Sequence, residues 1–242
     1  MNQSKAYNVL FVTNSAPGSM MHFLDAFQES MTLNVYVEYL YRNVMKTSFF
    51  QKVFHKLKVP LDNHHINQRI LDKNKRCAPD FIFIVKGNNI YPSTLRRLKE
   101  ENPNVKLVSF SNDNMALWHN KTLYYHFGVR YYDLVVSINI DGYKRIEERY
   151  KGNIIYLDKS FSRKYHYVDE IDKTIDVLFI GSYEKERYQD LQFLAEQGIR
   201  VDVFGNMWER IANDKINDNL IIHFKERVGH DYRKVISKSK IT

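Results

Sequence analysis

Six short segments of the chain carry residue types suited to chemistry, and each directly follows an apolar run. Ligands of parallel α/β sheets bind beyond the carboxyl ends of the strands, so these places come first if the apolar runs are parallel strands. The segments are Asn14–Gly18, Lys86–Asn89, Ser111–Asn114, Asn139–Asp141, Gly181–Tyr183 and Gly205–Trp208. A functional site is therefore expected among these residues.

Asp113 lies in the sequence "SFSNDN", at the tip of an expected strand. A carboxylate in this place can act as a general base and take a proton from the hydroxyl of an acceptor. An Asp between two Asn residues also forms Asx turns and helix caps, and this alternative is at least as strong. His22 and His119 are alternative bases, although a lone histidine is more often a packing or hydrogen-bonding residue.

The sequence "DVLFIGSYEKER", residues 176–187, is typical of a strand that passes into a phosphate-facing turn. Gly181 allows a phosphate to approach the backbone, Ser182 can donate a hydrogen bond, and the N-terminus of the following helix is electropositive. Arg187 lies near the start of that helix and can reach a diphosphate. The alternative is an ordinary strand-to-helix turn with a surface arginine, which is the commoner use of such a glycine.

The spacing of glycines and histidines excludes several other sites. The first turn, "TNSAPGS", has one glycine, so the dinucleotide fingerprint GxGxxG is absent, and the P-loop pattern GxxxxGKS/T is absent as well. His64 and His65 are adjacent and lack the four-residue spacing of a helical metal pair. A metal site is therefore not expected.

Apolar runs alternate with helical patterns along the chain, which predicts doubly wound parallel sheets. Strands are expected at 8–13, 33–40, 79–87, 105–113, 133–139, 153–157, 174–181, 199–205 and 219–224. Helices are expected at 20–31, 43–76 with a break at Pro60, 92–103, 142–150, 184–198 and 230–239. The predicted fold class is α/β, with two Rossmann-like, doubly wound parallel-sheet domains. The first spans 1–160, a polar linker spans 161–174, and the second spans 175–242 and looks incomplete.

Most of the net charge of +8 lies in one segment. Residues 42–76 hold nine Lys or Arg and two Asp, a charge of +7, which suggests an anionic partner at one face. Within this segment the helical pattern of 49–58 has an apolar arc of Phe49, Phe50, Val53, Phe54 and Leu57. One interpretation buries this arc against the sheet and leaves the lysines in water. The other places the arc against an anionic membrane or an acceptor.

The bulk composition fits a globular cytosolic protein. A chain of 242 residues with 44% hydrophobic residues is long enough to bury one large or two small cores. Cys77 is the single cysteine, so an internal disulfide is impossible and a reducing compartment fits best. The N-terminal sequence lacks a signal-peptide pattern, and no apolar run approaches the roughly 20 residues of a membrane span. The expected localisation is cytoplasmic, with peripheral contact at the inner face of a membrane.

The second half of the chain resembles the CgeB-like, spore-maturation-type glycosyltransferases of the GT-B fold. The resemblance rests on "DVLFIGSYEKERYQDLQFLAEQGIRVDVFGNMW", residues 176–208. In the first half, "PDFIFIVKG", "TLRRLKEENPNVKLVSFSND", "YDLVVSINIDGYKRI" and "NIIYLDKSF" occur in the order of the family. The resemblance runs from about residue 7 to the end. The order of the motifs over two domains carries more weight than any one motif.

The resemblance implies an enzyme that transfers a sugar from a nucleotide-sugar donor to a hydroxyl acceptor, in bacterial surface polysaccharide or glycoprotein assembly. It implies no bound metal and no other cofactor. The expected donor contacts are Gly181, Ser182, Arg187, Gly205 and Trp208. The expected catalytic residues are Asp113 and His22. The expected acceptor-side residues are Asn14, Gly18, Lys86 and Asn112.

In this family the second domain continues into further α/β units with an acidic donor-binding turn. Either the sequence up to Thr242 is truncated or the remaining units lie elsewhere. A second domain with half of its sheet is expected to bind the nucleotide poorly and to be inactive by itself, even if its parent is an enzyme. The alternative function is a noncatalytic α/β module that docks an anionic polymer, membrane or partner through residues 42–76. A nucleic-acid partner is not expected, because RNA-binding and helix-turn-helix motifs are absent.

Overall fold

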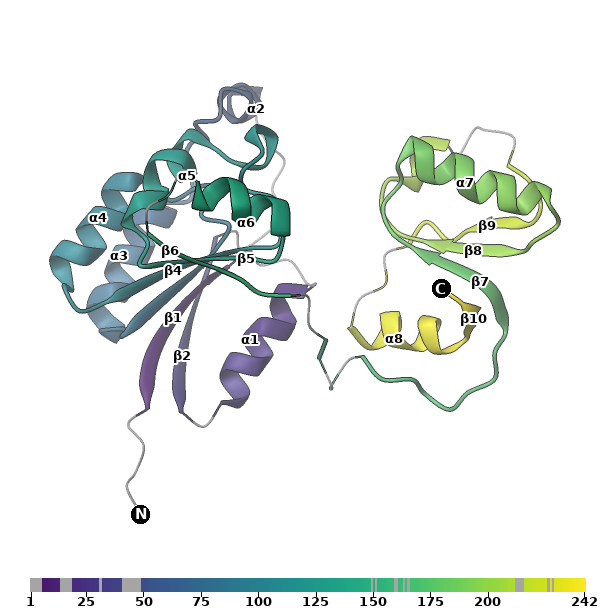
Figure 1. Ribbon diagram of the computed structural model, residues 1–242, viewed down its shortest axis with the longest axis horizontal. Helices are drawn as coiled ribbons and strands as arrows, with labels where there is room; N and C mark the ends of the chain where they lie inside the picture. Colours follow the sequence, from purple (N-terminus) through teal and green to yellow (C-terminus); the bar gives the residue numbers. More distant parts are fainter. Residues whose placement is uncertain are drawn as a thin grey trace, which may run out of the picture. The chain divides into compact units, whose positions relative to one another are not determined.

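The computed structural model describes residues 6–13, 19–30, 32–40, 49–148, 150, 152–158, 161–162, 164, 166–211, 216–225, 227 and 229–242. The chain divides into two compact units, Met1–Ser160 and Phe161–Thr242. Each unit has its own sheet and its own hydrophobic core (Figure 1).

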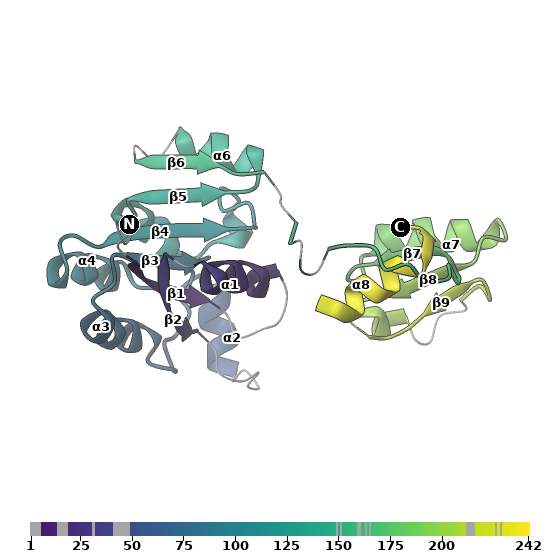
Figure 2. The same ribbon diagram turned by 90° about the horizontal axis from the view of Figure 1, so that it is seen from below.

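In the described part of the first unit, six strands form a parallel sheet in the order β2-β1-β3-β4-β5-β6 (Figure 2). Their bounds are β1 Tyr7–Thr13, β2 Leu33–Tyr39, β3 Phe81–Val85, β4 Lys106–Ser111, β5 Leu134–Ser137 and β6 Asn153–Tyr156. The strands β1 and β3 are central because their unbroken apolar sequences suit burial on both faces. The chain moves outward from β1 to β2 and then returns to β3, so the strand order reverses between β1 and β3. Ligands of such sheets bind at this reversal, beyond the carboxyl ends of the strands.

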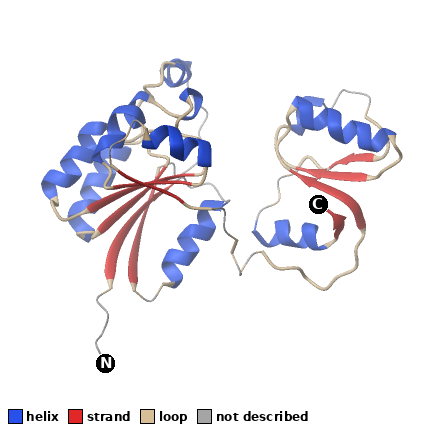
Figure 3. Cartoon of the chain, in the orientation of Figure 1, coloured by secondary structure: helices blue, strands red, loops and turns tan. Residues whose placement is uncertain are grey.

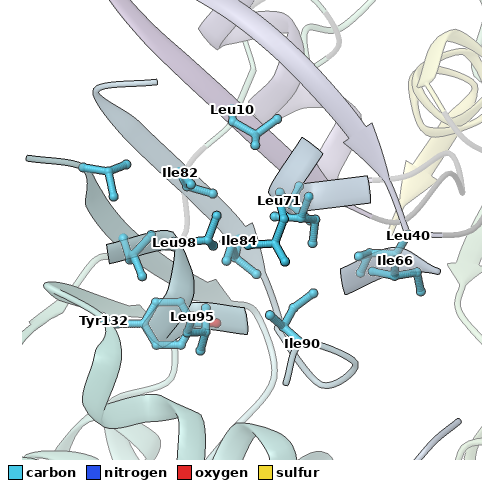
Figure 4. Packing of buried hydrophobic residues seen from close by; sticks show 14 of the residues in the cluster. Leu10, Leu40, Ile66, Leu71, Ile82, Ile84, Ile90, Leu95, Leu98 and Tyr132 are labelled. Atoms are coloured by element: carbon cyan, nitrogen blue, oxygen red, sulfur yellow. The ribbon is translucent and has the colours of Figure 1, made fainter. Parts of the chain in front are cut away.

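Helices cover both faces of this sheet (Figure 3). The helices of this unit are α1 Ser19–Glu29, α2 Phe49–Lys56, α3 Ile66–Cys77, α4 Pro92–Glu101, α5 Leu123–Gly128 and α6 Ile140–Glu147, with short 3-10 helices η1 Trp118–Asn120 and η2 Val129–Tyr131. Of these, α2 has no buried residue and does not cover the sheet. On one face α3 and α4 pack against the strands through Leu71, Leu95, Leu10 and Ile82 (Figure 4). On the other face α1 packs around Phe11. Successive residues of a strand point to opposite faces, so one apolar run serves both cores.

Part of the basic segment is neutralised inside the first unit. Glu38 on β2 is buried, and its carboxylate accepts a hydrogen bond of 2.8 Å from Nε of Arg69. Nζ of Lys73 lies 3.0 Å from the other carboxylate oxygen. The same two cations donate to the backbone carbonyls of Val37 and Tyr39. Arg69 and Lys73 therefore hold α3 against β2 through their ion pairs with Glu38, and their charges are used inside the unit.

Glu38→Gln is expected to lower the free energy of unfolding at pH 7 by about 1.5–3 kcal/mol, the worth of a hydrogen bond to a charged group. Burial alone would raise the pKa of Glu38, but the hydrogen bonds and charges of Arg69 and Lys73 outweigh it and lower that pKa below its ordinary 4.5. A lowered carboxyl pKa stabilises the fold above the unfolded-state pKa and ceases to do so as the pH falls through the folded-state value. Denaturant titrations at pH 7 and pH 3 measure both effects.

The difference between wild type and Glu38→Gln should therefore shrink at pH 3. A matched control is Glu100→Gln, which removes an exposed pair with Arg96 on α4 and should change stability little at either pH. Equal losses for the two variants at pH 7 would contradict a stabilising role for Glu38.

In the described part of the second unit, four strands form a parallel sheet in the order β10-β7-β8-β9. The elements are β7 Ile175–Ile180, α7 Lys185–Glu196, β8 Val201–Phe204, η3 Trp208–Ile211, β9 Leu220–Ile222, α8 Gly229–Ser237 and β10 Ser239–Ile241. The core joins α7 to β8 through Leu191, Ala195, Val201 and Val203. The strand order reverses between β7 and β10, so the expected ligand edge of this unit includes the end of β7.

Several elements differ from the sequence-based expectation. The sequence did not predict β10 or α5. The expected break of the 43–76 helical region at Pro60 is confirmed, because α2 ends at Lys56 and α3 begins at Ile66; residues 43–48 are outside the described residues. Part of the expected linker packs on the second unit, where the amide of Asp169 donates to Oγ of Ser237 at 2.9 Å. The guanidinium of Arg233 donates to the Asp169 carboxylate at 3.0 Å and lies 4.0 Å from the ring centroid of Tyr167. Both contacts tie residues 167–169 to α8.

Candidate functional site

A strained turn at the carboxyl end of β3 is the first feature of the candidate site. The amide of Gly87 donates to the carbonyl of Val85 at 2.8 Å, which closes a three-residue γ-turn around Lys86. Lys86 has φ 63° and Gly87 has φ 67°. A γ-turn with positive φ at a residue other than glycine is rare, and such backbone costs about 1–3 kcal/mol. Strain of this kind persists where the surroundings fix it, and it is concentrated at functional sites.

The strained turn brings Lys86 to Asp113. Nζ of Lys86 lies 2.5 Å from Oδ2 of Asp113, and both side chains are about one-third exposed. The turn after β4 is closed by Ser111, whose Oγ accepts from the amide of Asp113 at 3.1 Å. The Asp113 carboxylate itself therefore points to Lys86 at the carboxyl ends of two neighbouring strands. Two of the predicted site residues, from separate segments of the sequence, meet here.

The buried side chains of Tyr132 and Tyr125 pack against the Lys86–Gly87 turn. A Cβ at Gly87 would lie 2.6 Å from the hydroxyl of Tyr132, so only glycine fits. Burial raises the pKa of the Tyr132 phenol well above its ordinary value, and it raises the pKa of Tyr125 to about 12. Both rings are therefore neutral at any physiological pH. The sequence analysis did not identify these two tyrosines, because no motif or spacing distinguishes a buried tyrosine that supports a turn from any other buried tyrosine.

Side-chain amides clamp the rest of the 86–89 segment. Asn88 donates from Nδ2 to the carbonyl of Asn120 at 2.9 Å, and its own carbonyl accepts from Oγ1 of Thr122 at 2.7 Å. Asn67 of α3 donates to the carbonyl of Asn89 at 3.0 Å. These bonds join the segment after β3 to residues 120–122 and to α3, so the Lys86 side of the Lys86–Asp113 pair is fixed by several elements.

The end of β5 completes this edge of the first sheet. Oδ1 of Asn139 accepts from the amide of Gly142 at 2.8 Å and caps α6. A Cβ at Gly142 would lie 2.8 Å from Oδ1 of Asn114, so the 111–114 turn and the start of α6 are in close contact. Asn112, which belongs to the 111–114 turn and is predicted on the acceptor side, is exposed.

The other predicted residues of the first unit do not join this group. His22 is partly buried within α1. His119 is exposed in η1, and its carbonyl accepts from Nζ of Lys58 at 3.1 Å. Asn14 and Gly18 lie outside the described residues. Their roles therefore stay predictions.

In the second unit, Gly181 and Gly205 allow the backbones of the turns after β7 and β8 to contact each other directly. Gly205 has φ 152°, and a Cβ there would lie 2.0 Å from the carbonyl oxygen of Gly181. That carbonyl accepts from the indole Nε1 of Trp208 at 2.9 Å, and the amide of Gly181 donates to the carbonyl of Phe204 at 2.9 Å. Trp208 is fully buried, so its ring supports the turn from inside and presents no face to solvent.

Arg187 folds back onto the same turn. Its Nη1 donates to the carbonyl of Ser182 at 3.2 Å and lies 3.0 Å from the carboxylate of Glu184. The side chain is 43% exposed. Both contacts use one nitrogen, whereas a guanidinium carries five N–H groups. Arg187 can therefore bind an anion at the start of α7 without leaving the turn, where the helix N-terminus already favours negative charge.

Within the described ranges, no three His, Cys, Asp or Glu side chains gather in a way that could hold a metal ion. Among the helices that the structure describes, none has both the length and the apolar character to cross a membrane.

Comparisons with known proteins give fold neighbours only. No family model and no curated protein matches the chain, so the CgeB-like resemblance stays a prediction. An α-glucosyltransferase solved with UDP and a DNA 13-mer superposes with a TM-score of 0.63 at 16% identity, over 98% of this chain and 71% of its own. A UDP-GlcNAc 2-epimerase from Neisseria meningitidis, bound to UDP-GlcNAc, gives 0.56 at 10% identity, over 97% and 76%. The glycotransferase of kitacinnamycin gives 0.53 at 8% identity, over 90% and 71%. The predicted fold class is confirmed: two parallel α/β sheets of the GT-B kind, the second smaller.

Proposed function

We propose that the chain belongs to an enzyme that transfers a sugar from a nucleotide-sugar donor to a hydroxyl acceptor, with no bound metal. The observation that supports this most is the Lys86–Asp113 pair, held by a strained turn at the strand-order reversal of a GT-B-like fold. The biological setting we propose is bacterial surface polysaccharide or glycoprotein assembly, as in the CgeB-like glycosyltransferases that the sequence resembles.

The proposed chemistry assigns one task to each unit. Asp113 takes the proton of the acceptor hydroxyl, and Lys86 orients the carboxylate. The acceptor oxygen forms a bond to the anomeric carbon of the sugar, and the bond from that carbon to the diphosphate breaks. The electron pair leaves with the nucleoside diphosphate, which is held by the Gly181–Ser182 turn and Arg187. Negative charge on the leaving group is favoured there by the N-terminus of α7.

Arg187→Ala is expected to weaken the binding of UDP about tenfold or more, because a hydrogen bond to a charged group is worth about 1.5–3 kcal/mol. Isothermal calorimetry measures the affinity. The matched control is Lys185→Ala, which removes an exposed cation from the first turn of the same helix and should change the affinity little. Equal affinities of wild type and Arg187→Ala would remove Arg187 from the donor site.

The basic segment 42–76 is proposed to make peripheral contact with the cytoplasmic face of an anionic membrane. On α2 the side chains of Phe49 and Phe50 are 75% and 69% exposed, so the interpretation that buried the whole apolar arc is wrong for them. Lys52 and Lys56 are exposed on the same helix. Each Lys near an anionic bilayer contributes about 1 kcal/mol, and salt screens the attraction.

Vesicles that contain anionic lipid are expected to sediment the protein at low salt and to release it at high salt. Changing Lys52, Lys56 and Lys58 together to Glu should abolish sedimentation. The matched control changes the exposed Lys144, Lys173 and Lys225 to Glu, with the same change of net charge. Wild-type protein that stays in the supernatant at low salt would refute the membrane contact. Binding to duplex DNA in place of vesicles would assign the segment to a nucleic acid.

A further inference from the structure

A histidine ring is stacked and locked at the carboxyl edge of the second sheet. His223 directly follows β9, and its amide donates to the carbonyl of Val203 on β8 at 2.9 Å. Its ring lies parallel to that of Phe204, with centroids 4.1 Å apart and an interplanar angle of 1°. One face of the imidazole is therefore covered by the phenyl ring.

A buried carboxylate fixes the orientation of this ring. Nε2 of His223 lies 2.6 Å from Oδ1 of Asp202, whose side chain is almost fully buried. Nε of Arg200 lies 3.6 Å from the other oxygen of the same carboxylate. The His223 side chain is nevertheless 36% exposed. Phe204 holds the ring at one face and Asp202 holds it at one edge, while about a third of the side chain stays exposed. The ring is therefore a preorganised surface for stacking.

The position of the ring relates it to the Gly181–Ser182 turn. Ile180 of β7 pairs with Phe204 of β8, and Phe204 stacks on His223 after β9, so the three strand ends follow one another along one edge. Figure 1 shows β7, β8 and β9 side by side in this order. Two strand spacings are about 10 Å. This separation matches the distance between the diphosphate and the base of a nucleoside diphosphate.

We propose that His223 is the stacking platform for the base of the nucleotide donor. The inference rests on the proposed function, because it takes the Gly181–Ser182 turn and Arg187 as the diphosphate site. Aromatic rings bind bases through their π-faces, and this attraction tolerates different bases. Asp202 and Phe204 are positioning residues: they hold the imidazole parallel to the incoming base and touch no part of the ligand.

Two substitutions separate stacking from a structural role. His223→Phe keeps a flat ring and loses the bond to Asp202, whereas His223→Gln keeps a polar group within reach of Asp202 and loses the ring. The probes are UDP, GDP and inorganic pyrophosphate, which shares the diphosphate but has no base. His223→Gln should bind UDP and GDP about tenfold more weakly, about 1.4 kcal/mol, and bind pyrophosphate like wild type. His223→Phe should bind pyrophosphate like wild type and should bind UDP and GDP more tightly than His223→Gln does, because it keeps the ring although it loses the bond to Asp202 that orients it.

Thermal unfolding of both variants checks that the second unit is folded. An unchanged affinity of His223→Gln for UDP and GDP would overturn the stacking role and leave the proposed function standing. Equal weakening of the nucleotides and pyrophosphate in His223→Gln would show a general loss of the site and also overturn it. Wild-type protein that binds none of the three probes would overturn the proposed function, and the inference with it.

Discussion

Replacing Asp113 by Asn is expected to lower the rate of sugar transfer about 100-fold or more and to leave donor binding unchanged. The amide keeps the size of the carboxylate but cannot accept the proton of the acceptor hydroxyl, and a positioned general base contributes about 10²–10⁴-fold. Stopped assays of product formation with saturating donor and acceptor measure the rate. Calorimetry with the nucleotide alone measures donor binding.

The matched control for this experiment is Asp141→Asn. Asp141 is an exposed carboxylate in the first turn of α6, at the same edge of the first sheet. It should lose little activity. If Asp113→Asn kept full activity, Asp113 would not be the general base, and its role would be to form the turn after β4. Weaker donor binding in that variant would place the carboxylate at the donor instead of the acceptor.

Gly205→Ala should destabilise the second unit by roughly 2–6 kcal/mol. The new Cβ would lie 2.0 Å from the carbonyl oxygen of Gly181 and 3.3 Å from the amide nitrogen of Ser182. Both neighbours are backbone atoms and cannot turn aside, so overpacking of about 1–3 kcal/mol adds to the strain of φ 152° at alanine, again about 1–3 kcal/mol. The free energy of unfolding from denaturant titration measures the loss.

Gly198→Ala is the control that isolates the backbone strain. Gly198 ends α7 with φ 79°, and no atom lies within 4 Å of a Cβ built there. This variant should lose about 1 kcal/mol, at the low end for strain alone. If both variants lost the same free energy of unfolding, the clash of the new Cβ with the Gly181 backbone would have no energetic effect. The contact between the Gly181 and Gly205 turns would then not stabilise the donor turn.

Much of the fold was predictable because the strands are short apolar runs. "NVLFVT" and "FIFIV" must be buried on both faces, and this favours the centre of a parallel sheet over any exposed position. Pro92 begins α4 as expected from helix-terminus rules, and α4 ends at Glu101, shortly before the expected stop at Pro103. The meeting of the 86–89 and 111–114 segments follows from the adjacency of β3 and β4.

The features that were not predictable depend on tertiary contacts. The strand β10 is three residues long and polar at its centre, and it is a strand only because Ile241 pairs with Val177. Trp208 was predicted to contact the donor. The structure buries it beneath Gly181, where its indole supports the turn, and the spacing of residues in the sequence does not reveal this burial. The positive φ of Lys86 is equally invisible in sequence, because glycine is the residue that usually marks such backbone.

The release of nucleoside diphosphate from a panel of nucleotide sugars tests the central claim most directly. The panel is incubated with the full-length gene product as wild type and with its Asp113→Asn and Arg187→Ala variants, with and without a mixture of glycan acceptors, and the products are separated by chromatography. The proposed function predicts release from one donor by the wild type, faster with an acceptor, and at least tenfold slower in both variants. Protein that binds and consumes none of the nucleotide sugars, while it still binds anionic vesicles or polymers, would contradict the glycosyltransferase and favour the noncatalytic module.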